Sequence, residues 1–126
     1  MSERIIQNWL RLAEYDLTTA RSMLKEGRYL YVAFTCQQAV EKALKAIHVK
    51  NKKNTPPYTH NLAKLIHEAG IESPPNTIFI EELTSYYLES RYTEEIDAVE
   101  ARLTKDVADE ILKHAEELFS WLRMKI

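Results

Sequence analysis

Glycine and cysteine are scarce in this chain of 126 residues. The two glycines, Gly27 and Gly70, stand where helical patterns stop, so no glycine-rich loop is left to cradle a phosphate. The single cysteine, Cys36, excludes an internal disulfide and suits a reducing compartment. The sequence therefore predicts neither a Walker-type nor a Rossmann-type site, and we expect a cytoplasmic protein.

Long apolar runs and an excess of positive charge are also missing. No apolar run approaches the roughly 20 residues that cross a bilayer, and residues 1–4 lack a secretory signal pattern, so no membrane association is expected. The net charge of -2 gives no general basic field, so strong nucleic-acid binding is not expected either. A content of 45% hydrophobic and 29% charged residues is typical of one globular domain, which we place at 1–126.

Apolar residues repeat at helical spacing along most of the chain, and no strand pattern is present. The expected fold class is all-α, a five-helix up-and-down bundle with two long antiparallel central helices. Four of the helices are expected at 3–26, 29–50, 76–90 and 105–123. A short helix should lie between an N-cap at Thr59 and Gly70, while the acidic residues 92–103 are interpreted as a loop with at most a helical turn.

Side-chain periodicity also predicts which residues are buried. Leu12 falls in the apolar stripe of the first helix, and Cys36 falls in that of the second, where it should be an inert core thiol. Phe79 and Tyr86 lie off the main stripe of their helix, whereas Tyr87 faces inward. Exposed aromatic residues at 79 and 86 would mark the interface of a homodimer.

Two charged residues occupy apolar stripes. Asp16 lies among the apolar positions of the first helix, and Arg91 continues the inward line of the fourth. An unpaired buried charge is costly, so each should find a partner or belong to a site. Asp16 and Arg91 are candidates for each other, within one chain or across a dimer, and Glu41 competes for Arg91.

The second helix carries an ordered polar set, in which Gln37 and Glu41, and also Gln38 and Lys42, are four residues apart. Lys45 extends the same patch. One interpretation is a solvated face with side-chain pairs, and the other is a face that binds an anion, a nucleotide or a partner.

The four histidines, at positions 48, 60, 67 and 114, do not stand at the spacing of a known metal motif, so no metal site is expected. His60, at a helix start, is interpreted as a local hydrogen-bonding residue. No serine or cysteine nucleophile with an evident base can be named, and no cofactor is expected.

Three segments together resemble the HEPN family of small helical bundles. They are Cys36–Ala46 with its Gln-Gln-Ala-Val-Glu-Lys core, Thr59-His60-Asn61-Leu62, which begins 13 residues after Ala46, and Arg91-Tyr92. The likeness runs from about Trp9 to Trp121. It implies the helical fold, a homodimer and a gene that often stands beside one for a minimal nucleotidyltransferase.

Many HEPN proteins are metal-independent ribonucleases, in which an arginine is followed by four to six residues, the first of them polar, and then by a histidine. No arginine of this chain has a histidine five to seven residues after it, so the chain is similar to the branch that lacks this motif. The resemblance then implies no catalytic residue. It implies a non-catalytic module that binds a nucleotide, partners a minimal nucleotidyltransferase in a toxin–antitoxin-like gene pair, or does both.

The alternative is a metal-independent ribonuclease toxin with an atypical site, such as Arg91 with His60. For either function, the candidate ligand-binding or partner-binding residues are Asp16, Gln38, Glu41, Lys42, Lys45, His60, Tyr87 and Arg91.

Overall fold

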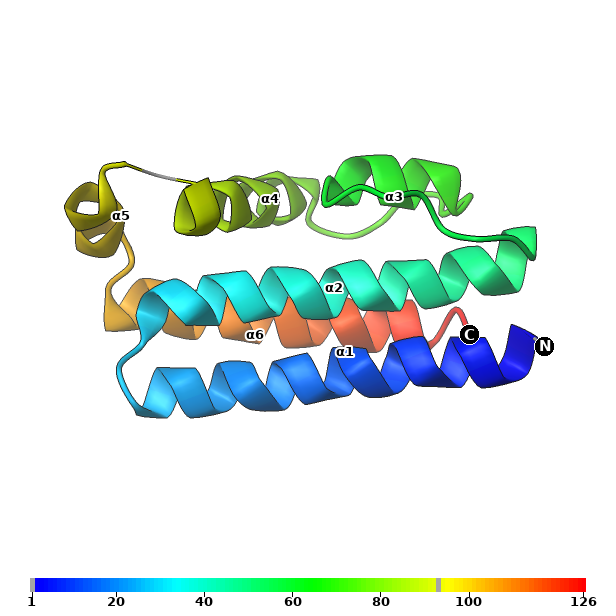
Figure 1. The fold of residues 1–126 in the computed structure, drawn as a ribbon, viewed down its shortest axis with the longest axis horizontal. Helices are drawn as coiled ribbons and strands as arrows, with labels where there is room; N and C mark the ends of the chain where they lie inside the picture. Colours follow the sequence, from blue (N-terminus) through cyan, green and yellow to red (C-terminus); the bar gives the residue numbers. More distant parts are fainter. Residues whose placement is uncertain (1, 93) are drawn as a thin grey trace.

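The computed structural model describes residues 2–92 and 94–126, apart from the side chains of Ser2, Ser90 and Tyr92, and every regular element in them is a helix (Figure 1). The predicted all-α class is confirmed, but the described residues form six helices instead of five. They are α1 (Ser2–Lys25), α2 (Tyr29–Lys52), α3 (Leu62–Glu68), α4 (Thr77–Tyr92), α5 (Ile96–Arg102) and α6 (Lys105–Arg123).

Helix α2 lies at the centre of the bundle. It runs antiparallel to α1, with α6 behind the pair and with α3 and α4 along the side of α2 that faces away from α1 (Figure 1). Helix α5 closes the end of the bundle where the α1–α2 turn lies. Because α2 contacts each of the other five helices, it is the element against which the rest of the chain is placed.

Small residues explain how α2 accommodates so many neighbours. Ala33, Cys36, Ala39, Ala43 and Ala46 are all fully buried on it. Short side chains let neighbouring helix backbones approach closely, and larger residues on the neighbours fill the space between. The polar residues of α2 are therefore held on a rigid, almost fully enclosed helix.

The two glycines end helices as the sequence predicts. Gly27 and Gly70 have φ angles of +77° and +75°, the left-handed region that a residue with a Cβ rarely adopts. At the end of α2, Lys53 takes a similar φ of +58°, and its N–H group donates to the carbonyl of Val49. The helix thus extends to Lys52, past the Lys50 end predicted from the sequence.

Helix α5 was not predicted, because its segment is acidic and only weakly periodic. It is nevertheless anchored by two residues, Val99 and Leu103, which are only 3% and 2% exposed. Burial of these apolar side chains outweighs the weak helical pattern of the surrounding sequence. The interpretation of 92–103 as a loop is therefore wrong for Ile96–Arg102, while Thr93 lies outside the described residues.

The N-cap of α3 is Asn61, not Thr59. The Asn61 side chain accepts a hydrogen bond from the backbone N–H of Lys64 at 3.2 Å. The Thr59 hydroxyl instead accepts from the backbone N–H of Asn61, which closes the turn before the helix. Both residue types favour the N-cap position. Asn61 occupies it because its backbone is extended and the helix starts at the next residue, Leu62.

Two burial predictions are also wrong. Leu12 is 48% exposed on the outer side of α1, whereas Phe79 is only 5% exposed and packs edge-on against His114, with 5.2 Å between ring centroids. Tyr86 is half-buried. The exposed aromatic pair expected at a dimer interface is therefore not present, and the homodimer itself stays a prediction.

None of the helices in the described part of the chain is both long enough and apolar enough to cross a bilayer. Within the same residues, no group of three or more histidine, cysteine, aspartate or glutamate side chains gathers as a metal ion requires.

Candidate functional site

A buried carboxylate, Glu41, lies at the centre of the polar residues on α2. Its side chain is only 4% exposed, yet three donors surround it. The distances to its oxygens are 2.7 Å from His60 Nδ1, 3.1 Å from Lys45 Nζ and 3.2 Å from Gln37 Nε2. Such a set of polar contacts compensates the loss of water around a buried carboxylate.

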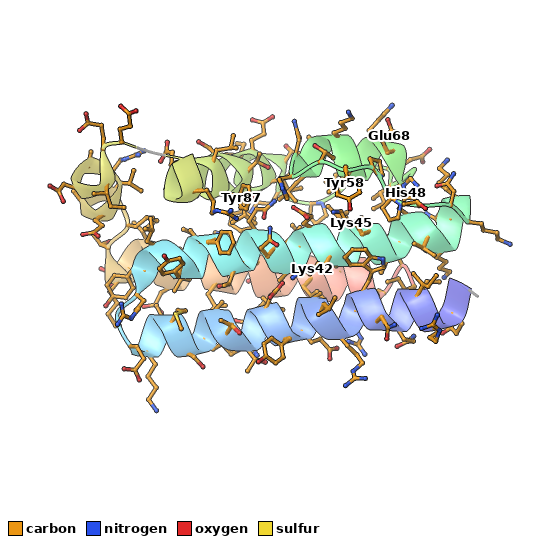
Figure 2. The ribbon with its side chains drawn as sticks, in the orientation of Figure 1. Lys42, Lys45, His48, Tyr58, Glu68 and Tyr87 are labelled. Carbon is orange, nitrogen blue, oxygen red and sulfur yellow. The ribbon has the colours of Figure 1, made fainter. Side chains whose placement is uncertain are left out.

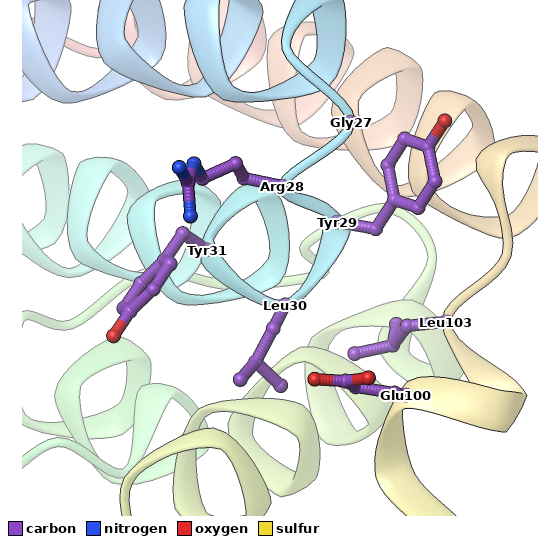
Figure 3. Close-up of a pocket in the computed structure, with 7 residues that line it drawn as sticks. All are labelled: Gly27, Arg28, Tyr29, Leu30, Tyr31, Glu100 and Leu103. Atoms are coloured by element: carbon purple, nitrogen blue, oxygen red, sulfur yellow. The ribbon is translucent and has the colours of Figure 1, made fainter. Parts of the chain in front are cut away.

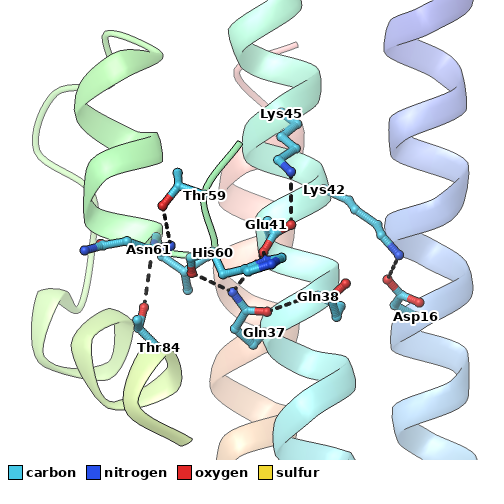
Figure 4. Close-up of polar contacts among 11 residues, drawn as sticks. Asp16, Gln37, Gln38, Glu41, Lys42, Lys45, Thr59, His60, Asn61 and Thr84 are labelled. Atoms are coloured by element: carbon cyan, nitrogen blue, oxygen red, sulfur yellow. Dashed lines mark hydrogen bonds and ion pairs between the residues drawn. The ribbon is translucent and has the colours of Figure 1, made fainter. Parts of the chain in front are cut away.

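The helix itself positions most of these groups, as Figure 4 shows. Gln37, Glu41 and Lys45 are spaced by four residues, so they follow one another along one side of α2. Gln37 is fully buried, and its amide also donates to the backbone carbonyl of His60 at 2.9 Å. Gln38 donates to the Gln37 carbonyl oxygen, also at 2.9 Å. We call these four residues and His60 the Glu41 cluster.

His60 comes from the segment that joins α2 to α3, and Glu41 and Gln37 each form a hydrogen bond with it. Its ring meets Glu41, and its carbonyl meets Gln37. A carboxylate anion only accepts hydrogen bonds, so with an ionised Glu41 the donor of this contact is Nδ1 of His60. The side chain is 51% exposed, so the rest of the ring faces the surface of the protein.

A row of aromatic rings extends from His60 towards the N-terminal end of α2. The ring centroids of His60 and Tyr87 are 4.8 Å apart, and those of Tyr87 and Phe34 are 5.5 Å apart with an interplanar angle of 14°. The Arg91 guanidinium carbon lies 5.1 Å from the Phe34 centroid and 5.9 Å from that of Tyr87. His60 and exposed Arg91 therefore both contact Tyr87, which is 1% exposed.

Lys42 also lies on α2, but its side chain points away from the Glu41 cluster, towards α1 (Figures 2 and 4). Its ammonium lies 2.6 Å from a carboxylate oxygen of Asp16, and both side chains are about one fifth exposed, at 21% and 17%. Asp16 is thus satisfied by Lys42 and not by Arg91. The prediction that Asp16 and Arg91 pair within one chain is wrong, and their approach across two chains stays a prediction.

Lys45 contacts both the Glu41 cluster and helix α1. Besides its bond to Glu41, its ammonium lies 5.5 Å from the centroid of Trp9 on α1, a distance at which a cation is attracted to a ring face. Figure 2 shows Lys42 and Lys45 on α2, with Tyr87 across from them on α4. The polar residues of α2 therefore contact α1 on one side and the segment before α3 on the other.

Six of the predicted candidates thus come together, namely Gln38, Glu41, Lys45, His60, Tyr87 and Arg91. Asp16 and Lys42 form a separate pair beside them. The interpretation of the polar residues of α2 as a solvated face is wrong for Glu41 and Gln37, because both are buried.

Sequence reasoning placed Gln37 in the polar set of the second helix without including it among the candidate residues, and it did not single out Phe34. The signal was present in their spacing, because they precede Glu41 by four and seven residues and so lie on the same side of α2.

Cys36 is no candidate for a nucleophile. Burial, with a smaller contribution from the nearby Glu116 carboxylate, raises the pKa of its thiol from the ordinary 9.0 to about 12. The thiolate is therefore scarce at neutral pH, which confirms that this is a buried core thiol.

A pocket lies elsewhere, at the turn between α1 and α2 (Figure 3). It has a volume of about 280 Å³ and is lined by Gly27, Arg28, Tyr29, Leu30, Tyr31, Glu100 and Leu103. None of the candidate residues lines it. The site proposed from the sequence is therefore a surface strip on α2 and its neighbours, distinct from this pocket.

Comparison with known proteins addresses the family and the fold. The model of the HEPN domain matches residues 6–125. A solved structure of TT1696 from Thermus thermophilus is similar, with a TM-score of 0.77 and 24% identity over 96% of this chain and 98% of the other. So is ST0689, described as an archaeal HEPN homologue, with a TM-score of 0.72 and 24% identity over 95% and 96% of the two chains. A search of curated proteins gave no match.

Proposed function

Because the chain belongs to the HEPN domain family, we propose that it is a non-catalytic module that holds a nucleotide beside Arg91 and His60 and partners a minimal nucleotidyltransferase. The observation that carries this proposal is the convergence of His60 and Arg91 on the ring of Tyr87. A histidine ring and a planar guanidinium then stand on one surface, over a rigid aromatic support.

Arg91 is the group suited to the phosphate. A guanidinium presents several N–H donors in a flat fork, which matches the oxygens of a phosphate and keeps its charge at every physiological pH. The contacts with Phe34 and Tyr87 hold the guanidinium plane beside α4. Lys42 and Lys45 form ion pairs with Asp16 and Glu41 and shape the site. We assign the phosphate to Arg91 because of its flat fork of donors and its contacts with two rings.

The non-catalytic character rests on the sequence. The arginine–histidine spacing of the ribonuclease members is missing, since no arginine here has a histidine five to seven residues after it. The partnership with a minimal nucleotidyltransferase rests on the resemblance to the branch without that motif.

Calorimetric titration with AMP, ADP and ATP tests the nucleotide site. Arg91→Met should weaken binding about tenfold, because a charge-assisted hydrogen bond contributes roughly 1.5–3 kcal/mol and 1.4 kcal/mol corresponds to a factor of ten. Arg102→Met is the matched control, because Arg102 is an exposed arginine of α5 that forms its ion pair with Glu89. Equal affinity of the Arg91 and Arg102 variants would show that phosphate is not held at Arg91. Co-purification with the product of the adjacent reading frame tests the partnership.

One observation favours the alternative, a metal-independent ribonuclease. The hydrogen bond between Glu41 and His60 Nδ1 orients a half-exposed imidazole that contacts the same ring as Arg91, and such an imidazole can move a proton of a bound RNA. Incubation with single-stranded and structured RNA in a chelating buffer decides between the two. Intact RNA supports the binding module, and cleavage that His60→Ala abolishes establishes the ribonuclease.

A further inference from the structure

We propose that Glu41 fixes His60 as the neutral tautomer with its hydrogen on Nδ1, and that Nε2 accepts a hydrogen bond from a sugar hydroxyl of a bound ribonucleotide. This inference rests on the proposed nucleotide site and specifies which end of the nucleotide meets which residue. The phosphate lies at Arg91, and the sugar lies over His60.

The first step concerns the hydrogen on Nδ1. Glu41 Oε1 lies 2.7 Å from this nitrogen, and Glu41 also accepts from the Lys45 ammonium and the Gln37 amide. The Lys45 ammonium and the Gln37 amide are donors whatever the state of His60, and they meet Oε2 and Oε1 respectively, so both oxygens act as acceptors, as they do in the anion. An anion facing Nδ1 requires Nδ1–H, and in a neutral ring the other nitrogen then carries a bare lone pair.

The second step concerns what can face that lone pair. Phosphate oxygens also carry lone pairs, so they are not bound by a neutral Nε2, whereas a hydroxyl or an N–H group is. The Arg91 guanidinium, which also contacts Tyr87, offers only donors. A ligand that contacts both groups therefore combines an anion with a hydrogen-bond donor.

A ribonucleotide has this combination, because its sugar hydroxyls lie next to the phosphate. A deoxyribonucleotide lacks one of them. A site that accepts a hydrogen bond from a ligand hydroxyl discriminates against the analogue without it, because the acceptor is left unpaired. The His60 side chain is 51% exposed, so water replaces part of the lost contact and the discrimination should be modest.

The experiment has a ligand-free part and a ligand part, both in mildly alkaline buffer, where an imidazole is neutral. Nitrogen-15 NMR of the histidine rings reads the tautomer directly. We expect His60 with hydrogen on Nδ1 in the wild type, and a shift towards hydrogen on Nε2 in Glu41→Gln, whose amide can donate to Nδ1.

Titration with AMP, GMP, CMP and UMP, and with the 2′-deoxy and 3′-deoxy forms of the nucleotide that binds best, provides the ligand part. One deoxy form should bind about three to ten times more weakly than the ribonucleotide, the range of one neutral hydrogen bond. His60→Ala should remove this difference while keeping the bond from Gln37 to the backbone carbonyl of residue 60. His67→Ala, at an exposed position of α3, is the control and should preserve it.

The outcomes separate the inference from the function on which it rests. If neither these four ribonucleotides nor ADP and ATP bind, the proposed nucleotide site and this inference both fail. If ribonucleotides bind but both deoxy forms bind as tightly as the ribonucleotide, only the inference is overturned. The same holds if wild-type His60 carries its hydrogen on Nε2.

Discussion

Removal of the Lys45 ammonium offers a sharp test of the buried ion pair on α2. Lys45 and Glu41 are four residues apart, 3.1 Å separates their charged atoms, and their side chains are only 12% and 4% exposed. Lys45→Met removes the charge and keeps a flexible apolar chain that can still contact Trp9. The carboxylate of Glu41 then stays buried with two donors in place of three.

The magnitude follows from burial. Breaking a buried pair by removing one partner costs roughly 3–5 kcal/mol, because the remaining charge is left uncompensated. His60 and Gln37 still donate to Glu41, so we expect a loss of about 2–3 kcal/mol in the free energy of unfolding. For a domain of this size, such a loss lowers the melting temperature by roughly 5–12 °C.

The chain contains its own control. Lys105 and Asp109 on α6 form a pair with the same spacing, 3.4 Å apart, but their side chains are 68% and 48% exposed. Lys105→Met should cost less than about 0.5 kcal/mol, as exposed pairs contribute little. Urea unfolding followed by circular dichroism at 222 nm measures both variants. Similar losses for the two would refute the argument that burial of Glu41 gives Lys45 its importance.

Two further predictions concern stability. Wild-type protein should lose stability relative to Cys36→Ala between pH 9 and about 12, since the thiol pKa is raised in the folded state and its contribution is fully present only below the unfolded value. The difference in unfolding free energy should change by roughly 1.4 kcal/mol between pH 8 and pH 10, and a pH-independent difference would contradict it. Asn61→Ala should cost about 1 kcal/mol through loss of the α3 cap, and Thr59→Ala should cost less; the opposite order in urea midpoints would restore Thr59 as the cap.

Much of the fold could be predicted from the sequence, because its long helices have regular apolar stripes. Helices α1, α2 and α6 follow this rule, and Gly27 and Gly70 mark stops that depend on local backbone geometry alone. Helix α5 could not be predicted, because Val99 and Leu103 anchor it through contacts with distant parts of the chain. Phe79 was placed wrongly for the same reason, since its burial depends on α6 and His114.

The candidate site was predicted in its residues but not in its connections. Spacing by four placed Gln37, Glu41 and Lys45 together on one side of a helix. Spacing does not reveal that the segment before α3 folds back and brings His60 to Glu41, which makes that side buried. The competition between Lys42 and Arg91 for Asp16 likewise depends on how α1 and α4 are arranged around α2, and this is a tertiary property.

The central position of α2 has a consequence for how the domain opens. Every other helix contacts α2, so no fluctuation can expose its backbone amides without detaching most of the bundle. Those amides should exchange with solvent deuterium only through global unfolding, whereas α5, a helix of seven residues at one end, can detach by itself. Gln37, Gln38, Glu41 and Lys45 are thus carried by the segment expected to exchange most slowly, whereas His60 comes from the loop before α3, and Tyr87 and Arg91 come from α4.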